Sequence, residues 1–160
     1  RYWSEGDEIV LDFPMPVRLM EGHPEMANMK NKVAVMRGPV VYCMEFPKQE
    51  GGEEIFNNGV FIPENIELKP EYRSDFLGGV TVLKGQALNQ EEKETFVANN
   101  SQLSEKQTSS DWKEGELYRP LKANEVSNPA EGSVELELIP YYAWANRGLA
   151  YMDVWIPLAR

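Results

Sequence analysis

Apolar residues recur at every second position in several short stretches of the chain. Successive side chains of a β-strand point to opposite faces, so this period predicts strands with one buried face. The stretches are residues 9–13, 80–82, 134–139 and 152–156. Two continuous runs rich in valine and aromatic residues, Lys32–Arg37 and Val40–Phe46, predict strands that are more deeply buried.

The signal for helices is weak by comparison. No long stretch has the 3.6-residue apolar period, and the best helical candidate, Asn89–Ala98, is short and mostly polar. Turn signals such as Gly38-Pro39 and Gly78-Gly79 separate the apolar stretches. This pattern predicts an all-β fold, an antiparallel β-sandwich of jelly-roll-like architecture, with a long polar loop over residues 99–116.

The length of 160 residues suits one ordinary domain. We expect residues 1–22 to be terminal strands of a preceding β-sandwich or a connector, with Met15–Met20 linking two layers. Residues 23–160 are expected to form a C-terminal β-sandwich domain. The start at Arg1-Tyr2-Trp3, without an initiator methionine, predicts a piece of a longer protein, so missing targeting signals leave the compartment open.

The balance of charges limits the classes of partner. Asp and Glu total 26 against 16 Lys and Arg, which gives a formal net charge of −10. A chain this acidic repels phosphate backbones and anionic membrane surfaces, so we expect no nucleic-acid and no membrane partner. No apolar run approaches the roughly 18 residues that a membrane-spanning helix needs.

The chain contains one cysteine, Cys43, and one histidine, His23. An intrachain disulfide is therefore impossible, and a zinc site built from Cys and His ligands cannot be assembled. Cys43 lies among apolar strand residues, which favours a buried structural thiol over a nucleophile. His23 lies between Gly22 and Pro24, a setting typical of a surface turn. We expect no catalytic residue and no metal site in this chain; carboxylate-ligated calcium is the one ion that the composition leaves open.

The acidic residues raise the possibility of glycoside hydrolysis, which usually needs two carboxylates about 5 to 10 Å apart. Glu135 and Glu137 lie on one face of a predicted strand. They alternate with Val134, Leu136 and Leu138, so the pattern predicts that both glutamates lie on the solvated face.

An aromatic cluster near the C-terminus is the main candidate binding site. It combines three rings with an amide and a guanidinium in Tyr141, Tyr142, Trp144, Asn146 and Arg147. One interpretation is a carbohydrate platform, in which the rings stack on sugar faces while Asn and Arg bind hydroxyls. The other is a packed corner in which Asn146 and Arg147 tie down a loop or dock onto another domain.

Three segments together resemble a known enzyme family. They are Trp3–Asp7 followed by Leu11–Arg18, then Lys32–Glu45, then Ile139–Gly148 continued by Met152–Trp155. Their order is similar to the C-terminal region of glycoside hydrolase family 127, the β-L-arabinofuranosidase-like proteins. The resemblance implies a catalytic helical α/α toroid followed by β-sandwich domains, with a zinc-held cysteine nucleophile and a glutamate in the toroid.

None of those catalytic motifs occurs in this chain, so no catalytic residue is carried over from the family. The resemblance implies a non-catalytic C-terminal β-sandwich domain of a glycoside hydrolase acting on L-arabinofuranoside-type glycans. Its partner would be the catalytic toroid of the same parent chain, which it braces, and zinc would be held only there. The alternatives are a carbohydrate-binding module with a glycan partner and a self-contained carboxylate hydrolase. The compartment is unknown from this sequence, and for the parent the resemblance is compatible with a periplasmic or secreted location.

Overall fold

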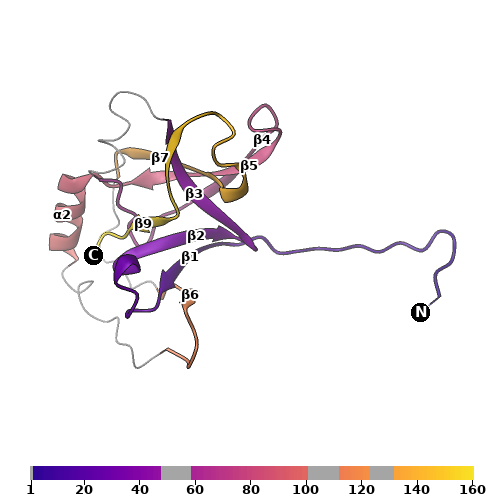
Figure 1. Cartoon of the computed structure of the whole chain (residues 1–160), viewed down its shortest axis with the longest axis horizontal. Coiled ribbons are helices and arrows are strands. Elements are labelled where there is room, and N and C mark those ends of the chain that lie inside the picture. Colours follow the sequence, from indigo (N-terminus) through magenta and orange to yellow (C-terminus); the bar gives the residue numbers. More distant parts are fainter. Residues whose placement is uncertain (1, 48–58, 101–111, 123–131) are drawn as a thin grey trace.

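In the described residues the fold is a single antiparallel sheet of nine strands that curls on itself, with one α-helix beside it (Figure 1). The structure is a computed structural model, and it describes residues 2–47, 59–100, 112–122 and 132–160. Strand order is β4-β5-β7-β3-β2-β1-β6, while β8 pairs with β3 and β9 pairs with β2. The strands are β1 (Val17–Gly22), β2 (Lys32–Arg37), β3 (Val40–Pro47), β4 (Lys69–Arg73), β5 (Val80–Ala87), β6 (Tyr118–Pro120), β7 (Val134–Pro140), β8 (Ala150–Asp153) and β9 (Trp155–Pro157). The predicted all-β, sandwich-like fold is confirmed.

The two continuous apolar runs form the hairpin β2–β3, as predicted. Val35 pairs with Tyr42 and Arg37 pairs with Val40, which leaves Gly38 and Pro39 as the turn. Gly38 has a φ of +55°, a left-handed conformation that glycine adopts without a steric penalty. Such a two-residue turn fixes the register of the hairpin, and the register decides which side chains enter the core.

Both faces of the central strands are buried. On β7, Leu136 and Leu138 enter the larger core cluster, whereas Ile139 points into a second cluster with Val82 and Cys43. This division follows from the two-residue period, because neighbouring side chains of a strand point to opposite faces of the sheet. Glu135 lies on the same face as Ile139 but is exposed, so its predicted solvated position is confirmed.

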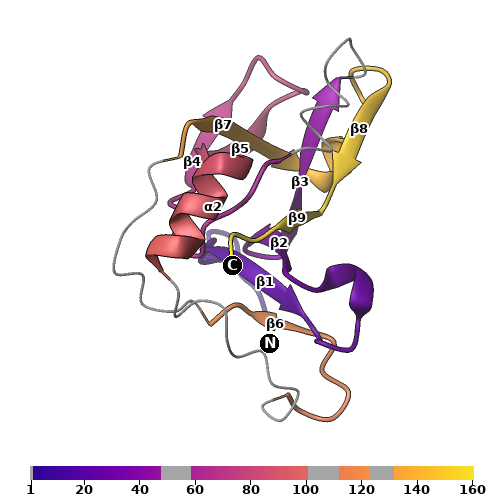
Figure 2. The ribbon, with the colours of Figure 1, turned by 90° about the vertical axis from the view of Figure 1, so that its left-hand side faces the viewer.

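Helix α2 (Gln90–Asn99) confirms the one helix that the sequence indicated. A capping box begins it: Asn89 accepts a hydrogen bond from the Glu92 N–H (2.9 Å), and Glu92 accepts one from the Asn89 N–H (3.0 Å). Phe96 anchors the helix by packing with Leu88 and Ala159, beside the C-terminus (Figure 2). No helix in the described ranges is both long and apolar enough to span a membrane.

The N-terminal segment differs from its sequence-based prediction. Alternation over residues 9–13 predicted a strand, but residues 8–16 form no strand, and the chain there runs away from the sheet (Figure 1). Alternation records only which side chains could be buried, and a strand also needs a neighbour to hydrogen-bond with. Ile9, Leu11 and Phe13 are between 62% and 72% exposed.

The expected connector Met15–Met20 is also partly wrong, because β1 begins at Val17 and pairs with both β2 and β6. The division of the chain between residues 22 and 23 stays a prediction, although β1 and β2 lie side by side in one sheet.

Two further stretches differ from the sequence-based expectation or lie outside the described residues. The predicted strand 152–156 is divided into β8 and β9, and Asp153 Oδ1 accepts a hydrogen bond from the Trp155 N–H (2.8 Å) at the break. Most of the expected polar loop, residues 101–111, lies outside the described residues. The strand order ends at β4 on one side and β6 on the other; each is short, and they contain Pro70 and Pro120.

Candidate functional site

The predicted binding cluster lies in residues 141–149, which we call the aromatic loop and which joins β7 to β8 (both labelled in Figure 2). It begins with a single 3-10 turn, Tyr141–Ala143, directly after the buried Pro140. Ala143 is 3% exposed and packs in the cluster of Cys43 and Ile139, so the start of the loop is fixed to the core.

The loop presents its large side chains to solvent. Tyr141, Tyr142 and Trp144 are 47%, 70% and 37% exposed, and Leu149 is 83% exposed. Large apolar side chains gathered on one exposed loop are typical of a surface that meets a partner or a ligand. The aliphatic Leu149 is a member of this surface that sequence reasoning missed.

The two polar members of the predicted platform are bound within the chain. Asn146 Nδ2 donates to the Ala143 carbonyl (3.1 Å), and Arg147 Nε donates to Glu45 Oε2 (3.1 Å). Arg147 Nη2 contacts the same carboxylate oxygen. The Ala145 N–H donates to Glu45 Oε1 (3.1 Å), where Ala145 has the left-handed φ of +64°. Sugar binding by Tyr141, Tyr142, Trp144, Asn146 and Arg147 stays a prediction.

A second contact holds the end of the loop. The guanidinium carbon of Arg147 lies 4.6 Å from the centre of the Phe76 ring, and that of Arg73 lies 4.5 Å from the same centre. Sequence reasoning missed both Glu45 and Phe76. Glu45 offered one usable signal, since a carboxylate within the apolar run of β3 needs a cation or donors around it.

Cys43 is fully buried, as predicted. Burial raises the pKa of its thiol to about 12, and the negative charge of Glu45 acts in the same direction. A thiol in this state is protonated at neutral pH, which is the opposite of what a cysteine nucleophile needs. In the described part of the chain, no three His, Cys, Asp or Glu residues are grouped so as to hold a metal ion.

The side chains of His23 and Glu137, the remaining candidates, contact other residues of the chain. His23 is half-buried, its Nδ1 accepts a hydrogen bond from the Glu25 N–H (3.3 Å), and its ring meets Trp112 edge-on at 4.9 Å. Glu137 is bound by Arg73 (3.4 Å) and lies 3.9 Å from Lys84 Nζ.

Known proteins resemble this chain over nearly its whole length. A model of the glycoside hydrolase family 127 C-terminal domain matches residues 17–157. A non-reducing end β-L-arabinofuranosidase of Bifidobacterium longum subsp. longum is 28% identical over 157 residues, which is 94% of this chain and 20% of that protein. The chain therefore spans about a fifth of the length of this curated relative.

Solved structures agree with the sequence match. A glycoside hydrolase is 38% identical with a TM-score of 0.58, over 91% of this chain and 20% of that one. A GH127 β-L-arabinofuranosidase from Geobacillus stearothermophilus T6 is 29% identical with a TM-score of 0.53, over 91% of this chain and 18% of that one. The chain belongs to glycoside hydrolase family 127, as the C-terminal domain of a β-L-arabinofuranosidase-like protein.

Proposed function

We propose that this chain is a non-catalytic domain that braces the catalytic helical domain of its parent, a hydrolase of L-arabinofuranoside-type glycans. The proposal is carried by the exposure of the apolar side chains of the aromatic loop. Its rings and Leu149 are exposed, while its polar side chains Asn146 and Arg147 are occupied within the chain. An exposed apolar surface on a rigidly held loop suits a neighbouring protein surface.

The N-terminal segment supports the same role. Tyr2, Val10 and Phe13 are at least 70% exposed, and the family model begins only at residue 17. We infer that residues 2–16 pair with or pack on the preceding part of the parent chain. Burial of these side chains would be favourable there, by about 1.5–3 kcal/mol for a fully buried large apolar residue.

We further propose that the preceding part of the parent chain carries out the hydrolysis. The buried, protonated thiol of Cys43 supports this assignment, because such a thiol is a poor nucleophile and a poor zinc ligand. The substrate class follows from the relatives, two of which are β-L-arabinofuranosidases.

One experiment separates bracing from catalysis. The isolated chain, supplied with zinc, is assayed on an aryl β-L-arabinofuranoside, and no turnover is expected. Zinc-dependent turnover by this chain would contradict the proposal.

A second experiment tests the docking surface itself. In the full-length parent, the pair Tyr142→Ala and Leu149→Ala should lower the melting temperature by about 2 °C or more. The same pair in the isolated chain should leave stability unchanged, because both side chains are exposed there. Tyr72→Ala is the matched control, since Tyr72 is 68% exposed but lies on β4. An unchanged parent would contradict docking through this loop.

The exposure of Tyr141, Tyr142 and Trp144 also favours a second candidate function, a carbohydrate-binding module. Calorimetric titration of the isolated chain with arabinan distinguishes the two. Saturable binding that Tyr142→Ala abolishes would favour the module over the brace.

A further inference from the structure

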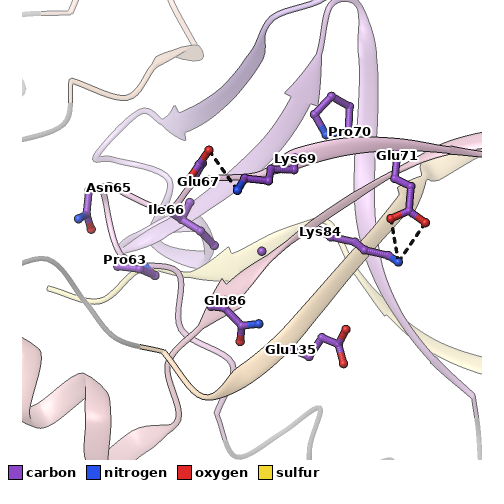
Figure 3. Close-up of a pocket in the computed structure, with 11 residues that line it drawn as sticks. Pro63, Asn65, Ile66, Glu67, Lys69, Pro70, Glu71, Lys84, Gln86 and Glu135 are labelled. Carbon is purple, nitrogen blue, oxygen red and sulfur yellow. Dashed lines mark hydrogen bonds and ion pairs between the residues drawn. The ribbon is translucent and has the colours of Figure 1, made fainter.

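A polar pocket lies at the opposite end of β7 from the aromatic loop, where β4 stops pairing with β5 (Figure 3). The last cross-strand pair is Lys69 with Lys84, and before it residues 63–68 leave the sheet. The space between that segment, β5 and β7 has a volume of about 690 Å³, within the usual range of small-molecule sites. We call it the β4–β5 pocket.

Its position depends on a glycine. A side-chain Cβ at Gly85 would lie 2.9 Å from the Glu67 carbonyl oxygen and 2.9 Å from Leu68 Cδ2. Residues 66–68 can therefore approach β5 closely only because position 85 has no side chain. This close approach builds one wall of the pocket.

Most of the charge in the pocket is neutralised locally. Lys84 Nζ lies 3.0 Å from the Glu71 carboxylate, and Lys69 Nζ lies 3.6 Å from the Glu67 carboxylate (Figure 3). Each lysine thus already faces a carboxylate, and the lining carries three carboxylates against two ammonium groups. An anionic ligand is disfavoured by this balance.

The groups left for a ligand are amides and one carboxylate. Asn65, Gln86 and Glu135 line the pocket, and each is exposed. Within the described ranges, none of the three makes a side-chain hydrogen bond or ion pair. A carboxamide both donates and accepts, and a carboxylate accepts, which is the set that hydroxyl groups require.

Apolar surface lies between these polar groups. Pro63, Ile66 and Pro70 also line the pocket, and aliphatic side chains of this kind can contact the C–H faces of a sugar ring. We propose that the β4–β5 pocket binds a neutral, hydroxyl-rich ligand, a short oligosaccharide. This inference does not rest on the bracing role, and it concerns residues other than the aromatic loop.

The test is a titration of the isotope-labelled chain with arabinotriose at millimolar concentration, followed by amide NMR shifts. Saturable shifts are expected at residues 65–67, Gln86 and Glu135. Gln86→Ala and Glu135→Gln should each weaken binding by about fivefold to tenfold, the loss that follows from one hydrogen bond. Both side chains are exposed, so the spectra of the free variants should report an intact fold.

Two controls make the result specific. Glu91→Gln removes another exposed carboxylate, on α2, and should leave the affinity unchanged. Tyr142→Ala should also leave it unchanged, because Tyr142 lies on the aromatic loop. The inference is overturned if no shifts occur or if they occur only at residues 141–149. It is also overturned if methylammonium, a small cation, competes with the sugar, because the pocket would then select a cation.

Discussion

The carboxylate of Glu45, within β3, is bound by the guanidinium of Arg147, which follows it by 102 residues. The Glu45 side chain is 2% exposed, and it also accepts the Ala145 N–H. One buried acid thus holds both the backbone and the side chain of the aromatic loop.

Replacement of this acid should therefore loosen the loop. Glu45→Ala should lower the free energy of unfolding by about 2 kcal/mol, because it leaves charged and backbone donors without an acceptor. Urea denaturation of the isolated chain measures the change. Glu94→Ala, an exposed change on α2, should alter stability by less than about 0.5 kcal/mol. Equal effects of the two substitutions would contradict the structural role of Glu45.

The thiol of Cys43 should be unreactive in the folded chain. It is fully buried and its pKa is raised to about 12, so labelling by a thiol reagent at pH 8 should proceed only as the protein unfolds. Ser74→Cys, which places a thiol at an exposed position, should react at once. Rapid labelling of native Cys43 would show that the core around it is open.

The same thiol makes stability depend on alkaline pH. In the unfolded chain it ionises near 9.0, whereas in the folded chain it ionises near 12. Its contribution is thus fully present below pH 9 and is lost as the pH rises toward 12. Unfolding midpoints of the wild type and of Cys43→Ala, measured across this range, should converge. A constant difference between them would contradict the raised pKa.

The capping box of α2 predicts a change at acidic pH. The Ser133 hydroxyl, together with the N–H groups of Asn89 and Ser133, holds the pKa of Glu92 below its ordinary value of 4.5. The stabilisation by Glu92 is therefore present above pH 4.5 and is lost as the pH falls through the lowered pKa.

Two variants separate the cap from general charge effects. Asn89→Ala should cost about 1 kcal/mol at neutral pH. Glu92→Gln should destabilise at neutral pH but not in acid, whereas Glu91→Gln, its exposed neighbour, should lack that pH dependence beyond a weak helix-dipole effect. Thermal unfolding at several pH values gives the comparison, and identical curves for the two glutamine variants would refute the capping role.

The pair of Glu21 and Arg119 joins β1 to β6 across a distance of 2.7 Å, and their side chains are 3% and 11% exposed. The Arg119 guanidinium also lies 4.1 Å from the centre of the Trp112 ring. Arg119→Ala should cost about 3 kcal/mol, because it removes the guanidinium that neutralises the buried Glu21 carboxylate. The double variant Glu21→Leu with Arg119→Met should recover most of that loss in urea denaturation. A double variant as unstable as Arg119→Ala would assign the loss to packing instead.

Local patterns predicted the fold well where burial and pairing coincide. The runs that form β2 and β3 are apolar on both faces, and the Gly38-Pro39 turn and all strand bounds except the end of β3, one residue later at Pro47, followed from the sequence. The alternation over residues 9–13 is as regular, yet no strand forms there. Periodicity describes the side chains of one segment, whereas a strand depends on a second segment whose presence the pattern does not encode.

The candidate site shows the same limit. The rings of the aromatic loop were evident in the sequence, but their exposure was not, because it depends on what the rest of the sheet leaves uncovered. The contacts of Arg147 with Glu45 and Phe76 join residues far apart in the chain. The β4–β5 pocket is likewise formed where three distant segments diverge, and no contiguous motif marks it.

The two ends of the strand order have a consequence for how the chain behaves in concentrated solution. A free sheet edge offers unpaired backbone groups on which another molecule can add a strand. Here both terminal strands are short, and Pro70 in β4 and Pro120 in β6 each remove one backbone donor, while β4 also carries alternating charges. These two edges are thereby poor templates for edge-to-edge pairing, even though the N-terminal segment and the aromatic loop leave apolar side chains uncovered.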